Sequence, residues 1–186
     1  ASRKNYGGYM NLWSQVHAVV PSSNTTVCMG GDWYTFPSHF FLPEQAHLGY
    51  VEDNFHGLLP QPFPPGPRGA SRTPLLPVND RNEEERSHYI PLNSCDYVVM
   101  TTPACAGLGV ASGEAHCTAE DQLTPLQQSI LGPISQFTPL HCEDIIDPKN
   151  SVSSLARAFY IPRLSEKSNR FMQYCLYSRS STKEKN

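Results

Sequence analysis

The sequence has few charged residues, and those present form no basic stripe. Lysine, arginine, aspartate and glutamate together make up 17% of its 186 residues, and the formal net charge is −3. Proteins that bind nucleic acid generally gather lysine and arginine along one face. The composition therefore gives no reason to expect nucleic acid as a partner.

Long apolar runs are also missing. No stretch approaches the roughly 20 apolar residues that a membrane-spanning helix requires, so we expect the chain as given to be soluble. The sequence starts at Ala1 without an initiator methionine, a signal peptide or a transit segment. This start is typical of a piece cut from a longer protein, although removal of a tag or a signal would leave the same residues.

The histidines and cysteines show no metal-ligand spacing. No two cysteines form a C-x-x-C pair, and the seven histidines are not grouped as zinc ligands are. We therefore expect no metal, and nothing in the sequence indicates a cofactor.

Six cysteines are present, and they are even in number and widely scattered. An oxidising compartment with one to three disulfides fits this pattern, and six cysteines allow 15 connectivities, none of which the sequence selects. Free buried thiols are an equally acceptable interpretation. The sequon at Asn24 lies in a polar turn and would be accessible to glycosylation if the chain is lumenal. The cysteines are Cys28, Cys95, Cys105, Cys117, Cys142 and Cys175.

Hydrophobic periodicity predicts the first elements. Apolar residues recur at spacings of three and four from Tyr9 to Val20, which indicates an amphipathic helix between Gly7-Gly8 and Pro21. A β-branched run over residues 25–29, a helical turn capped by Asp32 and an extended run over residues 47–51 follow. Together they predict a β-turn-α-β unit of a parallel sheet.

The second half predicts a closing strand and one strong central strand. Residues 97–101 are apolar throughout, which is typical of a strand buried on both faces. Residues 152–159 show a helical face that ends near Pro162, and residues 171–177 read as a strand. The expected fold class is α/β, with a small, largely parallel sheet flanked by helices, long proline-rich crossings and an irregular insertion.

We expect a single domain over residues 1–186, with an ordered core of residues 5–100 and 151–177. Seven prolines over residues 57–79 predict an extended surface crossing. Residues 102–147 are rich in small and polar residues and predict a partly mobile insertion, with a short helix near residues 126–131. Residues 178–186 predict a frayed tail.

The turn after residues 25–29 is the main candidate for binding a ligand. A strand that runs into glycines and a helix start presents backbone N–H groups, which suits a phosphate or a polar sugar. Aromatic side chains in the turn could stack on a sugar ring. The alternative is structural, with the glycines forming a tight turn and the aromatics filling the core. The residues are Gly30, Gly31, Asp32, Trp33 and Tyr34.

Other candidates are weaker. His39 lies close to Asp32 in sequence, but two such residues without a nucleophile or pocket are more often structural. Asp80 and the acidic run 83–85 could face glycan hydroxyls, although a solvated acidic face is the commoner outcome. Residues 57–63 predict a packing strap that could also form one wall of an acceptor groove.

Several short motifs, in one order along the chain, resemble a known family. Examples are Val27-Cys28-Met29-Gly30, Asp32-Trp33-Tyr34, Gly57-Leu58-Leu59-Pro60-Gln61-Pro62-Phe63 (close to G-x-L-P-x-P-F), Ser87-His88-Tyr89-Ile90 and Ala158-Phe159-Tyr160-Ile161-Pro162. They resemble the C-terminal lumenal region of the dolichyl-phosphate-mannose-dependent α-1,2-mannosyltransferase of asparagine-linked glycosylation, a glycosyltransferase of the C type. The match covers most of residues 5–100 and 151–177.

The resemblance implies a membrane enzyme of the endoplasmic reticulum that adds mannose to a lipid-linked oligosaccharide. Such an enzyme is inverting and metal-independent, and its proposed catalytic acid lies in a lumenal loop near its N-terminus. No catalytic residue therefore carries over to this chain. The implied partners are the membrane-embedded body of the same enzyme, the lipid-linked oligosaccharide acceptor and dolichyl-phosphate-mannose. The implied location is the endoplasmic-reticulum lumen, as part of a multi-pass membrane protein.

Three interpretations of the chain itself remain open. It could help to shape the acceptor site of the whole enzyme without being catalytic. It could be a glycan-binding module with measurable affinity of its own, or a purely structural domain needed for folding or assembly. The equivalent domain of a glycosylphosphatidylinositol-anchor mannosyltransferase is the alternative at the level of the family.

Overall fold

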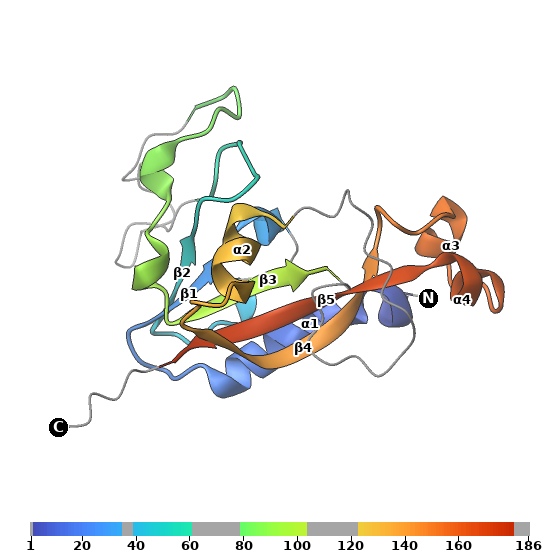
Figure 1. The fold of residues 1–186 in the computed structure, drawn as a ribbon, viewed down its shortest axis with the longest axis horizontal. Coiled ribbons are helices and arrows are strands. Elements are labelled where there is room, and N and C mark those ends of the chain that lie inside the picture. The colour runs from blue at the N-terminus through green and yellow to red at the C-terminus, as the bar shows by residue number, and fades with distance from the viewer. Residues whose placement is uncertain (1, 35–38, 61–78, 104–122, 181–186) are drawn as a thin grey trace.

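The computed structural model describes residues 2–34, 39–60, 79–103 and 123–180, and Figure 1 shows a sheet with helices packed around it. Within the described residues no helix is long and apolar enough to span a membrane. The helices are α1 (Ser2–Val19), α2 (Pro125–Leu131), α3 (Ser154–Ala158) and α4 (Leu164–Ser168). The strands are β1 (Thr25–Met29), β2 (Ala46–Tyr50), β3 (Tyr97–Thr102), β4 (Phe137–Asp147) and β5 (Arg170–Arg179).

The five strands form one mixed sheet in the order β2-β1-β3-β5-β4. β1 runs parallel to β2 and to β3, whereas β5 is antiparallel to both β3 and β4. The predicted parallel unit is confirmed, and its helical part is the 3-10 turn Gly31–Tyr34. The α/β class is therefore confirmed, with parallel strands at one side of the sheet and antiparallel strands at the other.

Helix α1 covers one face of the sheet. Its residues Leu12, Trp13 and Val16 are fully buried, as the spacing of apolar residues predicted. The ring of Tyr9 packs edge-on against Tyr174 of β5, with 5.0 Å between ring centroids. The strand residues in this part of the core are Val27, Met29, Val99, Ile145, Tyr174 and Leu176.

Helix α2 and the loops before β3 cover the opposite face. The side chain of Thr124 accepts a hydrogen bond from the N–H of Gln127, whose own side chain accepts one from the N–H of Thr124, so a capping box fixes the start of the helix. Leu126 and Ile130 are then buried against the sheet. Their neighbours in this cluster include Cys28, Cys95, Val98, Met100, Cys175 and Tyr177.

The start of α1 differs from the prediction. The helix runs through Gly7 and Gly8, which the sequence marked as its boundary. A Cβ atom on Gly8 would lie 2.4 Å from the carbonyl oxygen of Asp144 and 2.8 Å from Ile145 Cγ2. Glycine is thus required here because α1 approaches the backbone of β4 closely, a reason that the local sequence does not reveal.

Two disulfides hold the sheet together. Cys28 of β1 is bonded to Cys95, just before β3, with 5.7 Å between their Cα atoms. Cys142 is bonded to Cys175, directly opposite it on β5. No described cysteine is free, so the disulfide interpretation is confirmed for these four, while Cys105 and Cys117 lie outside the described residues.

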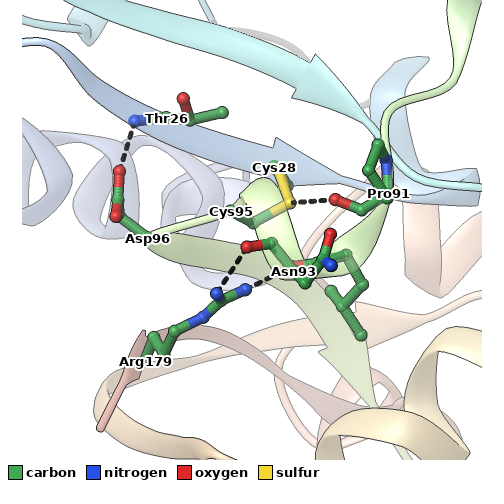
Figure 2. Close-up of a disulfide and its surroundings, with 8 residues drawn as sticks. Thr26, Cys28, Pro91, Asn93, Cys95, Asp96 and Arg179 are labelled. Atoms are coloured by element: carbon green, nitrogen blue, oxygen red, sulfur yellow. Dashed lines mark hydrogen bonds between the residues drawn. A yellow bond between two sulfur atoms is a disulfide. The ribbon is translucent and has the colours of Figure 1, made fainter. Parts of the chain in front are cut away.

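Arg179 ties the end of β5 to the loop that carries Cys95 (Figure 2). Its guanidinium donates hydrogen bonds to the carbonyls of Leu92 and Asn93. The same group lies 5.2 Å from the centroid of the Phe137 ring, a cation–π distance. Order therefore extends through Arg179, beyond the predicted end of the core at residue 177, and the prediction of a frayed tail is wrong at its first two residues.

The expected irregular insertion over residues 102–147 is wrong in its last part. The short helix near residues 126–131 is α2, but residues 137–147 form β4, an edge strand. β4 has a bulge near Pro139 and fully buries only Ile145 and Ile146, so it lacks the apolar pattern of a core strand. Residues 104–122 lie outside the described residues, and the division of the chain into core and insertion stays a prediction.

Candidate functional site

A polar cleft of about 270 Å³ opens at the carboxyl ends of the three parallel strands. In open α/β sheets, ligands bind outside the carboxyl ends of the strands. The 3-10 turn follows β1, Asp53 follows β2, and Thr101 lies near the end of β3. We call this hollow the Asp32 cleft. It is lined by Gly31, Asp32, Tyr34, Asp53, Asn54, Phe55, Met100, Thr101, Thr124 and Gln127.

The carboxylate of Asp32 joins β1 to β3. Its Oδ2 accepts hydrogen bonds from the backbone N–H and from the hydroxyl of Thr101, both 2.8 Å long. Burial raises the pKa of Asp32, the two hydrogen bonds from Thr101 lower it, and the nearby Asp53 raises it again, with a net upward shift. Asp32 thus bonds to a neighbouring strand, which the sequence did not predict, while its predicted role as a helix cap stays a prediction.

Asp53 joins the turn after β1 to helix α2. Its Oδ2 accepts from the N–H of Gly31 at 3.1 Å, and its Oδ1 accepts from the N–H of Leu126 at 3.4 Å. A Cβ atom on Gly30 would lie 2.5 Å from Leu126 Cδ2 and 2.9 Å from Asp53 Oδ2. Gly30 is therefore required by close packing, and the Gly31 N–H is already bonded to a carboxylate.

Gln127 lines the cleft from helix α2. Its side-chain amide donates to the carbonyl oxygen of Thr101 at 2.8 Å, while its carbonyl accepts from the N–H of Thr124. The residue is buried, so the amide is held in place by the capping box of α2. Helix α2 is thereby fixed to the end of β3.

The aromatic residues of the turn have different positions. Trp33 packs edge-on against Phe55, with 5.3 Å between ring centroids, and does not line the cleft. Tyr34 lines the cleft and is 67% exposed. Burial and the Asp32 carboxylate raise the pKa of Tyr34, so its hydroxyl remains protonated at neutral pH. Tyr34 is thus the ring in the turn that a ligand in the cleft can reach.

The chemistry of the cleft favours a neutral polar ligand. Two carboxylates face it, and the N–H of Gly31 is occupied by one of them, so the phosphate part of the hypothesis loses its support. Hydroxyl and amide groups beside an aromatic ring suit a sugar. The volume lies just below that of usual small-molecule sites, about 300–1,000 Å³, and fits a single sugar ring. The described residues contain no group of three or more histidine, cysteine or acidic side chains placed to hold a metal.

The structure does not bring the other predicted residues into the cleft. The side chain of His39 lies outside the described part of the chain, so its pairing with Asp32 stays untested. Asn24 is exposed beside β1, and its glycosylation stays a prediction. Glu84 accepts a hydrogen bond from the hydroxyl of Tyr89, and Glu85 caps a short 3-10 turn, so this acidic run is partly structural.

The strap over residues 57–63 is described only up to Pro60. Leu59 is buried, and its carbonyl contacts the ring of the buried His88 at 3.1 Å. The N–H of Leu58 donates to Asn82. These contacts support the packing role, and it is Phe55, before the strap, that reaches the cleft.

Sequence reasoning missed Asp53, Thr101 and Gln127. Asp53 follows the second predicted strand, Thr101 lies near the end of the central strand, and Gln127 lies at the start of the short helix. The available signal was a polar residue directly after a buried strand, since the carboxyl ends of parallel strands meet at one edge of the sheet.

The sequence is similar to part of several α-1,2-mannosyltransferases. It is 32% identical over 182 residues to the alpha-1,2-mannosyltransferase ALG9 of Mus musculus, a match that covers 93% of this chain and 27% of that protein. The Homo sapiens protein of the same name is 31% identical over 97% of this chain and 28% of its own length. The Saccharomyces cerevisiae protein is 32% identical over 92% of this chain and 28% of its own length.

No protein-family profile and no solved structure matches the sequence. The chain spans little more than a quarter of the length of the curated relatives that it matches. The matches nevertheless cover 92–97% of this chain in relatives from mammals and yeast. The chain is therefore homologous to part of the α-1,2-mannosyltransferases named ALG9, and the resemblance that its motifs indicated is confirmed.

Proposed function

We propose that this chain is the lumenal, non-catalytic domain of an endoplasmic-reticulum α-1,2-mannosyltransferase. The whole enzyme transfers mannose from dolichyl-phosphate-mannose to the lipid-linked oligosaccharide used for N-glycosylation. Within it, the domain packs on the membrane-embedded body, and the Asp32 cleft contacts a sugar of the acceptor. The names of the relatives support the activity, and the cleft supports the role of this domain.

The observation that carries the proposal is the position of Tyr34. It is an exposed aromatic ring at the rim of a cleft whose floor is made of fixed hydrogen-bonding groups. Aromatic rings stack on the apolar faces of sugars, while hydroxyl, amide and carboxylate groups bind their hydroxyls. Both carboxylates of the cleft accept hydrogen bonds from the chain itself, from Thr101 to Asp32 and from Gly31 to Asp53, so binding is the function that the cleft suits.

Titration with an α-1,2-linked mannose disaccharide tests the binding role. We expect the 186-residue chain to bind weakly, with a Kd on the order of millimolar, and to show NMR shifts at Tyr34, Thr101 and Gln127. Tyr34→Ala should weaken binding. Phe40→Ala is the matched control, because Phe40 is also exposed but does not line the cleft. An equal response of both variants, or shifts confined to another surface, would contradict this site.

Kinetics of the whole enzyme test the division of labour. Tyr34→Ala in the full-length protein should raise the KM for the lipid-linked acceptor and leave the KM for the donor unchanged, because only the acceptor contacts this cleft. The 186-residue chain alone, incubated with both substrates, should form no product. Transfer of mannose by the isolated chain would refute the non-catalytic role.

A further inference from the structure

In the connection between β4 and β5, large apolar side chains are exposed and small or polar ones are buried. We call residues 148–171 the α3–α4 module; they include α3, α4 and the first two residues of β5. Figure 1 shows these two helices projecting beyond the end of the sheet. Large apolar side chains are exposed throughout the module: Val152, Leu155, Phe159, Leu164 and Phe171.

Small and polar residues form the interior of the module. Ser151, Ala156, Ser165 and Asn169 are buried. The side-chain amide of Asn169 donates to the carbonyl of Ala156 at 3.1 Å, and the hydroxyl of Ser165 accepts from the N–H of Ile161 at 2.8 Å. The buried residues of the module are therefore small or polar, and hydrogen bonds connect them to the backbone.

Exposed apolar residues gather around α3. Leu155 lies in the helix and Phe159 is its C-cap, four positions further on, which places the two close to each other on one side. Val152 lies just before the N-cap of the helix. Val152 is 88% exposed and Phe159 60% exposed. The periodicity that predicted a buried face of this helix is real, but only Ala156 faces the interior. Grouped apolar exposure of this kind marks a surface that meets an apolar partner.

The charges of the module are mostly of one sign. Five basic residues and one acidic residue, Glu166, fall within residues 148–171, a net charge of +4 in a chain whose formal net charge is −3. Arg163, Lys167 and Arg170 are exposed. Apolar side chains surrounded by lysine and arginine suit the boundary between the headgroups and acyl chains of an anionic membrane.

From this combination we infer that the α3–α4 module docks on a lipid surface. Val152, Leu155 and Phe159 enter the acyl boundary, and the basic residues lie at the level of the lipid phosphates. Charge complementarity favours an anionic lipid surface, because the exposed basic side chains Arg163, Lys167 and Arg170 lie in the same module as the exposed apolar ones. The inference does not depend on the proposed function, since it involves neither mannose donor nor acceptor.

Vesicle sedimentation tests the docking. The 186-residue chain is mixed with vesicles of phosphatidylcholine alone, or of four parts phosphatidylcholine to one part phosphatidylserine. We expect binding to the anionic vesicles that weakens as salt is added. Replacement of Arg163 or Lys167 by glutamine should lower the partition coefficient about fivefold for each positive charge removed. The variant Val152→Asp, Phe159→Asp should lower it about tenfold or more.

Ile134→Asp is the matched control, because Ile134 is 93% exposed and lies outside the module. Exposed substitutions leave the core intact, and the thermal unfolding of each variant verifies this. Phe159→Trp adds a direct readout, since its emission should be quenched by vesicles with brominated acyl chains. Absence of binding to anionic vesicles, or equal losses in the module variants and in Ile134→Asp, would overturn the inference. Binding of the apolar surface to a protein partner and to no lipid would also overturn the inference.

Discussion

Asp32 and Thr101 connect the first and third strands through a carboxylate that accepts two hydrogen bonds, each 2.8 Å long. The two residues are 69 positions apart in sequence. Their strands are neighbours in the parallel part of the sheet, so the pair forms the floor of the cleft at its carboxyl edge. Burial of this carboxylate raises its pKa above the usual value of 3.8, and that shift has a measurable consequence.

Asp32→Asn should be neutral or slightly stabilising at pH 7, whereas Asp32→Ala should destabilise the fold by about 2 kcal/mol. The asparagine retains an acceptor for Thr101 and removes a desolvated charge, while the alanine leaves the donors of Thr101 unsatisfied. Urea unfolding at pH 7 measures both. A loss in Asp32→Asn equal to that in Asp32→Ala would show that the negative charge itself is needed.

The pH dependence of this pair follows from the sign of the shift. Because the folded pKa of Asp32 lies above 3.8, the native state holds this proton more tightly than the unfolded state. Ionisation of Asp32 therefore costs stability, and the cost disappears as the pH falls through the folded pKa towards 3.8. The stability difference between Asp32→Asn and the wild type should shrink over that interval, as unfolding at pH 7 and pH 4 would show.

Removal of either disulfide should destabilise the domain, and somewhat more for the bond that closes the longer loop. Cys28–Cys95 spans 67 residues and Cys142–Cys175 spans 33. The chain-entropy model gives about 4 kcal/mol for the first and roughly 0.5 kcal/mol less for the second. Denaturant unfolding of the two double-alanine variants would measure this. A larger loss from the shorter loop would indicate that local packing in the β4–β5 pair, and not chain entropy, dominates.

Gly8→Ala should destabilise the protein by about 1–3 kcal/mol, because a Cβ atom would collide with the backbone of Asp144. Gly7→Ala is the control in the same helix, and it should show the ordinary gain of about 0.5–1 kcal/mol that alanine brings to a helix interior. Thermal unfolding separates the two variants. Stabilisation by both would mean that α1 moves away from β4 without cost.

Arg179→Lys should be destabilising even though it retains the charge. The guanidinium donates to the carbonyls of Leu92 and Asn93 at once and lies over Phe137. A lysine ammonium is a compact charge that cannot reproduce this planar arrangement. We expect a loss of about 1 kcal/mol, measured by urea unfolding, with Arg179→Met losing more. Equal stability of the lysine variant and the wild type would show that the contact depends on charge alone.

The elements predicted from the sequence were those with strong local signals. Residues 97–100 are continuously apolar, and their strand, β3, lies in the centre of the sheet. Thr124-Pro125 signals the start of α2 in the sequence itself. β4 has no such signal, because an edge strand buries few side chains and tolerates Pro139 at a bulge. The glycines of α1 gave a false boundary, since the reason for Gly8 lies in β4, more than a hundred residues away.

Of the segments that form the candidate site, the sequence predicted only the turn after β1. The turn after β1 is visible in the sequence through Gly30 and Gly31, but its partners come from three other segments. Asp53 and Gln127 reach the cleft only after the parallel strands and α2 are assembled. A local pattern therefore locates a turn, whereas the assignment of a cleft requires the sheet.

The position of β5 in the sheet determines when, during synthesis, the domain can fold. β5 is the last strand of the sequence, yet it lies between β3 and β4 and pairs with both. A ribosome that has released the chain only as far as residue 169 has supplied four strands that cannot form one sheet. Cys142, synthesised 33 residues before Cys175, must remain unpaired or form a wrong bond until then. Folding of this domain is thus a late event in its own synthesis, and its thiols need protection in the interval.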